Sequence, residues 1–256
     1  MYNLSDEVKE FLKTYKVGDY ERPSVTVDIL IFTIFNNRLN LLLIKRKACP
    51  FKNKWAIPGG FLDLAKNETI EQAADRELFE ETNIKGYLEQ FGVFSEPDRD
   101  PRTRVISNGF VALVPSKQLI ENMRAGDDAK EVELFEIILD NSKTDFSHLQ
   151  NIYGFKINKE DLAFDHAEII KKALNFLQQK LLYGNSKFIF FSFLNKDSFI
   201  ISDLQRVYEA IKGEKLITSN FRRDFIKRYV KEGLAEETGE LRKHQRPAKL
   251  YRLRGI

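Results

Sequence analysis

The segment from Gly60 to Ile84, GFLDLAKNETIEQAADRELFEETNI, places three glutamates on one face of a predicted helix. Glu77, Glu80 and Glu81 follow the spacing i, i+3 and i+4, which confines them to about 100° of arc on an α-helix. Like charges on one face repel each other, so a cation is expected among them. Oxygen ligands suit hard ions, and such ions commonly share phosphate oxygens. The spacing therefore predicts a helix that holds Mg²⁺ or Mn²⁺ against a diphosphate-containing small molecule.

The residues around these glutamates predict a helix that packs on a sheet beside a closely approaching loop. The face opposite the glutamates is apolar and carries Ala73, Ala74 and Leu78. Gly59-Gly60 precedes the helix, and glycine lets the backbone approach closely and frees a carbonyl for a metal. Arg76 can pair with a neighbouring carboxylate and orient it. The alternative, a solvated helix whose carboxylates bind nothing, does not account for this combination.

The whole stretch resembles the Nudix box, G-x5-E-x7-R-E-U-x-E-E-x-G-U. The matching positions are Gly60, Glu68, Arg76, Glu77, Leu78, Glu80, Glu81 and Ile84. The resemblance implies a Nudix α/β/α sandwich with a mixed sheet. It also implies hydrolysis of a nucleoside diphosphate linked to another moiety, with Mg²⁺ or Mn²⁺ as cofactor.

The same resemblance implies a role for each matching residue. Metal ligands would come from Glu77, Glu80 and Glu81, assisted by Glu68 and the Gly60 carbonyl. Arg76 would orient a glutamate. A metal-activated water would attack phosphorus, with a carboxylate as base.

Two positions depart from the Nudix pattern. Seven residues separate Gly60 from Glu68, where the pattern has five. We expect the longer loop to affect the position of Glu68 and the turnover rate more than metal binding itself. Asn83 stands where the pattern has glycine, a mild change because asparagine tolerates a left-handed backbone.

A second cluster of candidate ligands lies in the loop EPDRDPRTR, residues 96–104. It contains Arg99, Arg102 and Arg104, and arginine binds phosphate bidentately. The RDPR sequence resembles the same position in Nudix proteins that act on ADP-ribose and in related sugar-sensing regulators. That resemblance implies that the three arginines bind ligand or fix the loop. The alternative is a charged surface loop held by Asp–Arg pairs.

Other candidates stand alone. Lys45 and Arg46 end a predicted strand and can face phosphate. The alternative is that they take part in a charge pair on an edge strand. Glu131 is the candidate for a late catalytic base. In the segment LAFDH, Asp165 is expected to begin a helix, with His166 as an N-terminal helix residue rather than a ligand.

The charge distribution divides the chain into two modules. Residues 184–256 contain 16 Lys and Arg against 9 Asp and Glu, a balance of +7, whereas residues 1–183 have a balance of −4. Turn-forming residues 183–186 lie where the balance changes sign. We therefore expect a Nudix domain over 1–183 and a second domain over 184–256. A basic module favours nucleic acid as a partner, although basic residues can also merely solvate a small domain.

The second domain is expected to be a winged helix-turn-helix. Helices over 202–212 and 218–231 precede two short strands, 234–237 and 249–253, around a basic tip. The second helix would enter a major groove. The expected DNA-binding residues are Asn220, Arg222, Arg223, Lys227, Arg228, Arg242, Lys243 and Arg246.

This domain order resembles the NrtR-type and sugar-responsive Nudix transcriptional regulators. The resemblance implies a homodimer in which ligand bound to the Nudix domain shifts the affinity for double-stranded DNA. The alternative is a winged helix that serves for interaction or dimerisation.

Periodicity predicts the remaining elements. Strands are expected over 24–35, 38–47, 87–93, 105–115 and 131–139, with a tight turn at Asn36-Asn37. Amphipathic helices are expected over 5–16 and 167–182.

Composition excludes several classes. No apolar run reaches the roughly 18 residues of a membrane span, and the N-terminus lacks the apolar region of a signal peptide. The single cysteine, Cys49, cannot form an internal disulfide. We expect a cytoplasmic protein. Its leading function is hydrolysis of an ADP-ribose-like substrate, with ligand-responsive regulation beside it. The alternative is a regulator that senses a nucleotide or sugar with little or no hydrolysis.

Overall fold

The computed structural model describes residues 4–16, 18, 21–122, 129–183, 189–195, 197–242 and 247–254. Its strands are β1 (Ser24–Phe35), β2 (Arg38–Arg46), β3 (Trp55–Ala56), β4 (Gly59–Phe61), β5 (Tyr87–Phe94), β6 (Val105–Leu113), β7 (Ala129–Leu139), β8 (Phe146–Gln150), β9 (Lys156–Ile157), β10 (Ala235–Arg242) and β11 (Ala248–Leu253). Its α-helices are α1 (Asp6–Thr14), α2 (Ile70–Thr82), α3 (Ser116–Asn122), α4 (His166–Tyr183), α5 (Ile201–Lys212) and α6 (Thr218–Phe225). Short helical turns are η2 (Leu64–Lys66), η3 (Lys159–Asp161), η4 (Ile189–Phe193) and the π-helical η5 (Ile226–Val230).

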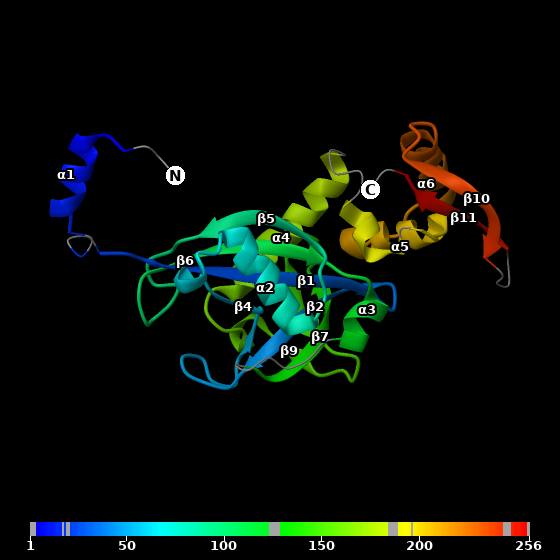
Figure 1. The fold of residues 1–256 in the computed structure, drawn as a ribbon. Helices are drawn as coiled ribbons and strands as arrows, with labels where there is room; N and C mark the ends of the chain where they lie inside the picture. Colours follow the sequence, from blue (N-terminus) through cyan, green and yellow to red (C-terminus); the bar gives the residue numbers. More distant parts are fainter. Residues whose placement is uncertain are drawn as a thin grey trace.

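A mixed sheet forms the centre of the N-terminal part (Figure 1). The main path of strands runs β5-β6-β1-β2-β7-β8-β9, with β3 and β4 pairing at its side. Only β1 and β6 pair in parallel among the described strands. Asn36 and Asn37 both have positive φ, 51° and 61°, as a two-residue type I′ hairpin turn requires. The predicted turn is confirmed.

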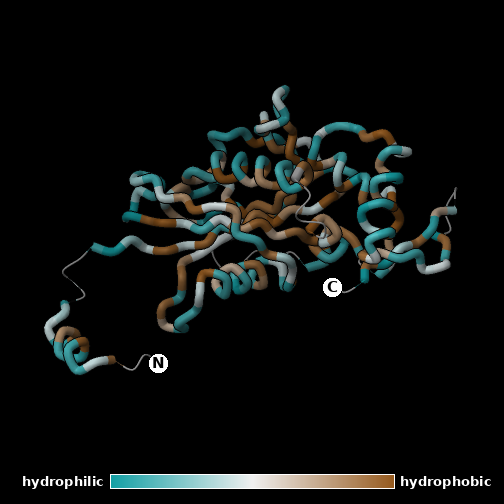
Figure 2. Tube along the Cα trace, turned by 90° about the horizontal axis from the view of Figure 1, so that it is seen from above, coloured by the Kyte–Doolittle hydropathy of each residue, from teal (hydrophilic) through white to brown (hydrophobic). Residues whose placement is uncertain are grey.

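Helices cover both faces of this sheet because its strands are apolar on both sides. Leu30 and Phe32 of β1 pack in one core with α4, while Ile29 and Ile31 pack in a second core with α2. Figure 2 shows the apolar chain concentrated in the central strands. The α/β/α sandwich with a mixed sheet is therefore confirmed.

α2 is the predicted glutamate helix, and capping residues fix both of its ends. Thr69 and Gln72 form a reciprocal capping box at its start, which satisfies two free backbone N–H groups. Asn83 ends it in the left-handed conformation, with φ 53°. Asparagine thus adopts the backbone conformation that the glycine of the Nudix pattern would adopt.

The C-terminal module is a winged helix, as the sequence predicts. α5 and α6 precede the hairpin of β10 and β11, and an isolated antiparallel bridge joins Phe199 to Tyr251 of β11. Packed rings fill its core: Phe190, Phe191, Phe199, Tyr208, Phe225, Tyr229 and Tyr251. The sequence analysis missed η4 and the bridge at Phe199. Both are too short to show a period.

The two modules share one apolar core rather than meeting only at a linker. Residues of α4, η4 and α5 belong to the same buried cluster as the sheet. Gln178 of α4 donates a hydrogen bond to the carbonyl of Ile211 in α5 at 3.3 Å, and Lys143 pairs with Glu214 at 3.2 Å. The expected boundary at 183/184 adjoins residues 184–188, which lie outside the described residues, so it stays a prediction.

One helix stands apart from this body. α1 begins at the predicted cap, Ser5, and contains no buried residue (Figures 1 and 2). Across the described ranges, no helix has both the length and the apolar character that a membrane span needs.

Candidate active site and DNA-binding face

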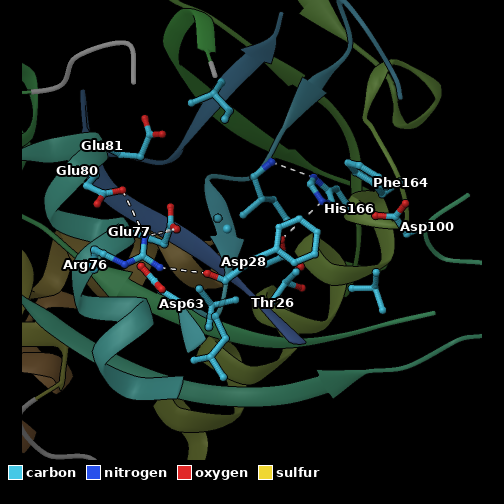
Figure 3. A pocket seen from close by; sticks show the side chains of 18 of the residues that line it. Thr26, Asp28, Asp63, Arg76, Glu77, Glu80, Glu81, Asp100, Phe164 and His166 are labelled. Atoms are coloured by element: carbon cyan, nitrogen blue, oxygen red, sulfur yellow. Dashed lines mark hydrogen bonds and ion pairs between the residues drawn. The ribbon is translucent and has the colours of Figure 1, made fainter. Parts of the chain in front are cut away.

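A cavity of about 770 Å³ brings the two predicted clusters together (Figure 3). The predicted residues on its wall are Arg46, Gly60, Arg76, Glu77, Glu80, Glu81, Arg99 and Arg102. Three other candidates, Glu68, Arg104 and Glu131, do not line it. One wall is therefore acidic, from α2, and another is basic, from the loop that precedes β6.

Arg76 lies at the centre of the acidic wall. Its guanidinium donates to both carboxylate oxygens of Glu68, at 2.8 and 3.0 Å, and to Glu77 at 2.6 Å. A longer contact, 3.4 Å, reaches Glu80. The positive charge holds these carboxylates together and gives Glu77 a fixed orientation, which is the contact expected for Arg76.

The two extra residues of the loop fold into a turn of their own. In η2, Asp63 accepts hydrogen bonds from the backbone N–H groups of Ala65 and Lys66, and Asn67 closes the turn with φ 50°. Glu68 consequently returns to α2, where it also accepts from the backbone N–H of Asp63 at 2.7 Å. Hydrogen bonds from Arg76 and from Asp63 lower the pKa of Glu68. Glu68 is thus an anchor for Arg76 behind the cavity wall.

Glu77 is buried between this arginine and the glycine loop. Burial raises the pKa of its carboxyl, and Arg76 opposes that rise. A Cβ atom placed on Gly60 would lie 2.0 Å from Glu77 Oε1. A side chain at position 60 would therefore require the Glu77 carboxylate to move away from β4.

On the basic wall, two of the three predicted arginines are held by aspartates. Arg99 is buried and binds Asp165 through two hydrogen bonds, at 2.8 and 3.0 Å, and Asp28 through one at 3.2 Å. Arg102 binds Asp100 through Nε and Nη2 at 3.0 and 2.7 Å. The Asp–Arg pairs that the sequence analysis left open are thus present. Arg104 is exposed away from the cavity.

The floor of the cavity contains polar residues that the sequence analysis did not assign to the site. Asp28 accepts a hydrogen bond from Ser107 at 2.6 Å. His166, the first residue of α4, accepts one from the backbone N–H of Ile57 at its Nδ1, at 2.9 Å. Its Nε2 lies 3.7 Å from Asp28. A single acid within the apolar strand VTVDILIF was the only sequence signal for Asp28.

Glu131 lies on β7 and pairs with Lys45 of β2 at 3.2 Å. Lys45 also lies over the ring of Trp55, 5.3 Å from its centroid. Lys45 therefore forms a charge pair, as one alternative had it, and its partner is the predicted base. The expectation of an edge strand was wrong, because β2 lies between β1 and β7. Residues 123–128, which precede β7, lie outside the described residues.

The winged helix presents most of its predicted DNA-binding residues to solvent. Asn220, Arg222, Arg223, Lys227 and Arg228 are exposed along α6 and η5. Arg242, on β10, instead pairs with Asp203 of α5 at 2.9 Å. Lys243 and Arg246 lie outside the described residues.

Comparison with known proteins matches both modules. Residues 25–144 match the NUDIX domain, and residues 191–253 match the NrtR DNA-binding winged helix domain. The ADPR responsive transcriptional repressor NtrR of Acinetobacter baylyi is 32% identical over 252 residues, which cover 98% of this chain and 89% of the relative. The chain belongs to the NrtR-type Nudix proteins.

Two further similar proteins divide between enzyme and regulator. An ADP-ribose pyrophosphatase of Methanocaldococcus jannaschii is 40% identical over 164 residues, which cover 64% of this chain and 79% of the relative. Shewanella oneidensis NrtR, solved in complex with a 27mer DNA, superposes with a TM-score of 0.68 at 28% identity. The superposition covers 90% of this chain and 93% of that one.

Nudix hydrolases generally use divalent metals, and the acidic wall fits one by its donor chemistry. Glu77, Glu80, Glu81 and the Gly60 backbone supply only oxygen donors, which hard ions prefer. Within the described part of the chain, no three acidic, histidine or cysteine side chains converge on one point, because Arg76 lies among the glutamates. A hard ion bound at this wall would complete its shell with phosphate oxygens of a ligand.

Gly60→Ala is expected to lower Nudix hydrolysis by about 100-fold, since a displacement of about 1 Å in an active site can cost that much. The added Cβ would overlap the Glu77 carboxylate and displace it. Product release from ADP-ribose measures the effect. Gly86→Ala is the matched control, because a Cβ there meets no atom within 4 Å. Equal activity of both variants would contradict the close packing of Gly60 against Glu77.

The buried His166 predicts a pH dependence of stability. Burial lowers its pKa, although Asp28 and Asp165 oppose this effect. Below about pH 6.5 the unfolded chain binds a proton that folded His166 does not, so the free energy of unfolding falls as pH falls. Arg99 and Arg46 also face the ring and disfavour its charged form.

His166→Asn tests this dependence, because the amide retains an acceptor for the Ile57 N–H. Urea unfolding at pH 7.5 and 5.5 is expected to show a smaller loss of stability in the variant than in the wild type. An identical loss in both proteins would exclude His166 as the titrating group.

Proposed function

We propose that the protein hydrolyses ADP-ribose or a closely related nucleotide sugar, and that the same ligand controls its binding to double-stranded DNA. The observation that carries this proposal is the cavity in which an acidic wall faces guanidinium groups. Two relatives support the proposal by their names: one is an ADPR responsive transcriptional repressor, and the other is an ADP-ribose pyrophosphatase.

The cavity residues would have different roles in diphosphate hydrolysis. A divalent ion held by Glu77, Glu80, Glu81 and the Gly60 carbonyl would lower the pKa of an attacking water and neutralise phosphate charge. Arg76, anchored by Glu68, fixes the orientation of Glu77. Arg46 and Arg102 lie where they can contact phosphate, whereas Arg99 supports the wall through its two aspartates. Glu131 stays a candidate for the base.

Incubation with ADP-ribose and Mg²⁺ or Mn²⁺ tests the enzyme. We expect release of AMP and ribose 5-phosphate, and loss of the reaction when the ion is chelated. No cleavage of ADP-ribose or of a wider panel of dinucleotides and nucleotide sugars, with either ion, would overturn the proposal.

The alternative, a sensor with little hydrolysis, is favoured by the continuity between the two modules. α4 begins at the cavity floor with His166, and Gln178 near its other end bonds to α5 of the winged helix. A ligand that moves the floor would therefore move the DNA-binding module. Gel shifts with upstream genomic fragments, with and without ADP-ribose and in chelator, measure this coupling. Unchanged DNA affinity would argue against it.

A homodimer and a cytoplasmic location, both expected from the sequence, stay predictions. Sedimentation equilibrium of the full chain measures the first. Fractionation of cells that produce the protein measures the second.

A further inference from the structure

The cationic side chains of the cavity differ in how firmly the protein holds them. In the described part of the chain, those that line it are Arg46, Lys66, Arg76, Arg99 and Arg102. Each of the last three binds one carboxylate through two hydrogen bonds. Arg46 donates to the carbonyl of Pro50 at 2.9 Å. The four guanidinium groups therefore have defined positions before any ligand binds.

Lys66 is held much more weakly. Its ammonium has one ion-pair partner among the described residues, the Asp63 carboxylate at 3.1 Å, and its side chain is 63% exposed. An exposed pair of this kind contributes little to stability, because water screens the two charges. An ammonium has three donors, so Lys66 can donate to a ligand without leaving Asp63. It is therefore the cation of the cavity that a ligand can recruit most easily.

The longer glutamate loop is what brings Lys66 to the cavity. The loop between Gly60 and Glu68 exceeds the Nudix pattern by two residues and contains η2, of which Lys66 is the last residue. Asp63 caps η2 through its Oδ1 and pairs with the Lys66 ammonium through its Oδ2. Figure 3 shows Asp63 near Arg76, on the acidic side of the cavity. The expansion thus adds a positive charge to the acidic wall.

We propose that Lys66 is a further substrate-binding residue, whose ammonium donates to a phosphate oxygen of the bound diphosphate. The assignment rests on the proposed function, because it places the diphosphate against the same wall. Glu77, Glu80 and Glu81 together carry more negative charge than one divalent ion neutralises, so the wall would still repel phosphate. An ammonium on that wall opposes the repulsion, and as a compact point charge it can reach phosphate from several directions.

Two probes test Lys66 in the full chain. ADP-ribose with Mg²⁺ measures hydrolysis, and inorganic pyrophosphate with Mg²⁺ measures binding of a diphosphate alone, by calorimetric titration. Lys66→Gln is expected to raise the KM for ADP-ribose and the Kd for pyrophosphate by about tenfold, the lower end for a hydrogen bond to a charged group, with little change in kcat. Lys66→Arg should restore most of the affinity, because it retains the charge. The difference between Lys66→Gln and the wild type should shrink as salt rises, since the site is exposed.

Lys85→Gln is the matched control, because Lys85 is exposed in the same module and does not line the cavity. Equal affinities of the wild type and Lys66→Gln for both probes, equal losses in Lys66→Gln and Lys85→Gln, or no binding of pyrophosphate to the wild type would each overturn the proposal. Faster hydrolysis by Lys66→Gln would also overturn it, because Lys66 would then oppose the metal rather than bind the ligand. Pyrophosphate binding that depends on Lys66, without cleavage of ADP-ribose, would instead overturn the proposed substrate and leave the role of Lys66 standing.

Discussion

Replacement of Glu80 by glutamine is expected to lower the rate of ADP-ribose hydrolysis by at least about 100-fold, the usual cost of losing a catalytic carboxylate or metal ligand. Glu80 lines the cavity on the same face as Glu77 and Glu81, and its side chain is half exposed. Its ion pair with Arg76 is long, at 3.4 Å, and no other ion pair of Glu80 is present among the described residues. The substitution therefore removes a negative charge from the acidic wall without removing a buried ion pair.

The effect should fall on turnover more than on folding. We expect an unchanged midpoint of thermal unfolding, because the Glu80 side chain is half exposed and supports no buried contact among the described residues. Glu71→Gln is the control on the same helix, since Glu71 is exposed and lies outside the cavity. If Glu80→Gln hydrolyses ADP-ribose at the wild-type rate with either ion, Glu80 has no part in catalysis.

The glutamate helix could be predicted from sequence because all its information is local. The spacing of Glu77, Glu80 and Glu81, the apolar opposite face and the flanking glycines lie within one stretch of chain. The extended loop before Glu68 was harder to interpret. Its extra residues form a capped turn, and only the structure shows that Glu68 still reaches Arg76.

The cavity floor could not be predicted in the same way. Asp28, Arg99 and Asp165 meet from three segments that are far apart in sequence. Each would satisfy a surface position equally well, and only the pairing of β1 with β6 and the start of α4 bring them together. The contacts of Arg102 with the rings of Phe61 and Phe164 have the same origin, since these residues become neighbours only after the sheet and α4 have packed. Short strands such as β3 and β9 were missed because two residues show no period.

In the winged helix, some features could be predicted from the sequence and others could not. Its helices and hairpin follow from periodicity, and so does the exposure of Arg222 and Arg223. The π-helical turn at η5 does not, because its backbone pattern has no sequence period of its own. The partner of Arg242 was also not predictable, since Asp203 lies on another element.

Replacement of both Arg222 and Arg223 by alanine is expected to weaken DNA binding at least tenfold near physiological salt. Each residue is exposed on α6, and each phosphate contact contributes about 0.9 to the slope of log affinity against log salt concentration. The double variant should therefore lower that slope by up to about 2 for a duplex of random sequence. Fluorescence anisotropy across a salt series measures both quantities.

Two comparisons separate phosphate contact from net charge. Lys9→Ala with Lys13→Ala removes the same charge from α1, far from the winged helix in Figure 1, and should leave the slope unchanged. Arg242→Ala should change the slope less than the α6 pair, because Arg242 is paired with Asp203 and acts mainly by holding β10 against α5. An equal fall in slope for the α1 and α6 pairs would mean that DNA responds only to total charge. The second helix would then lose its role in DNA recognition.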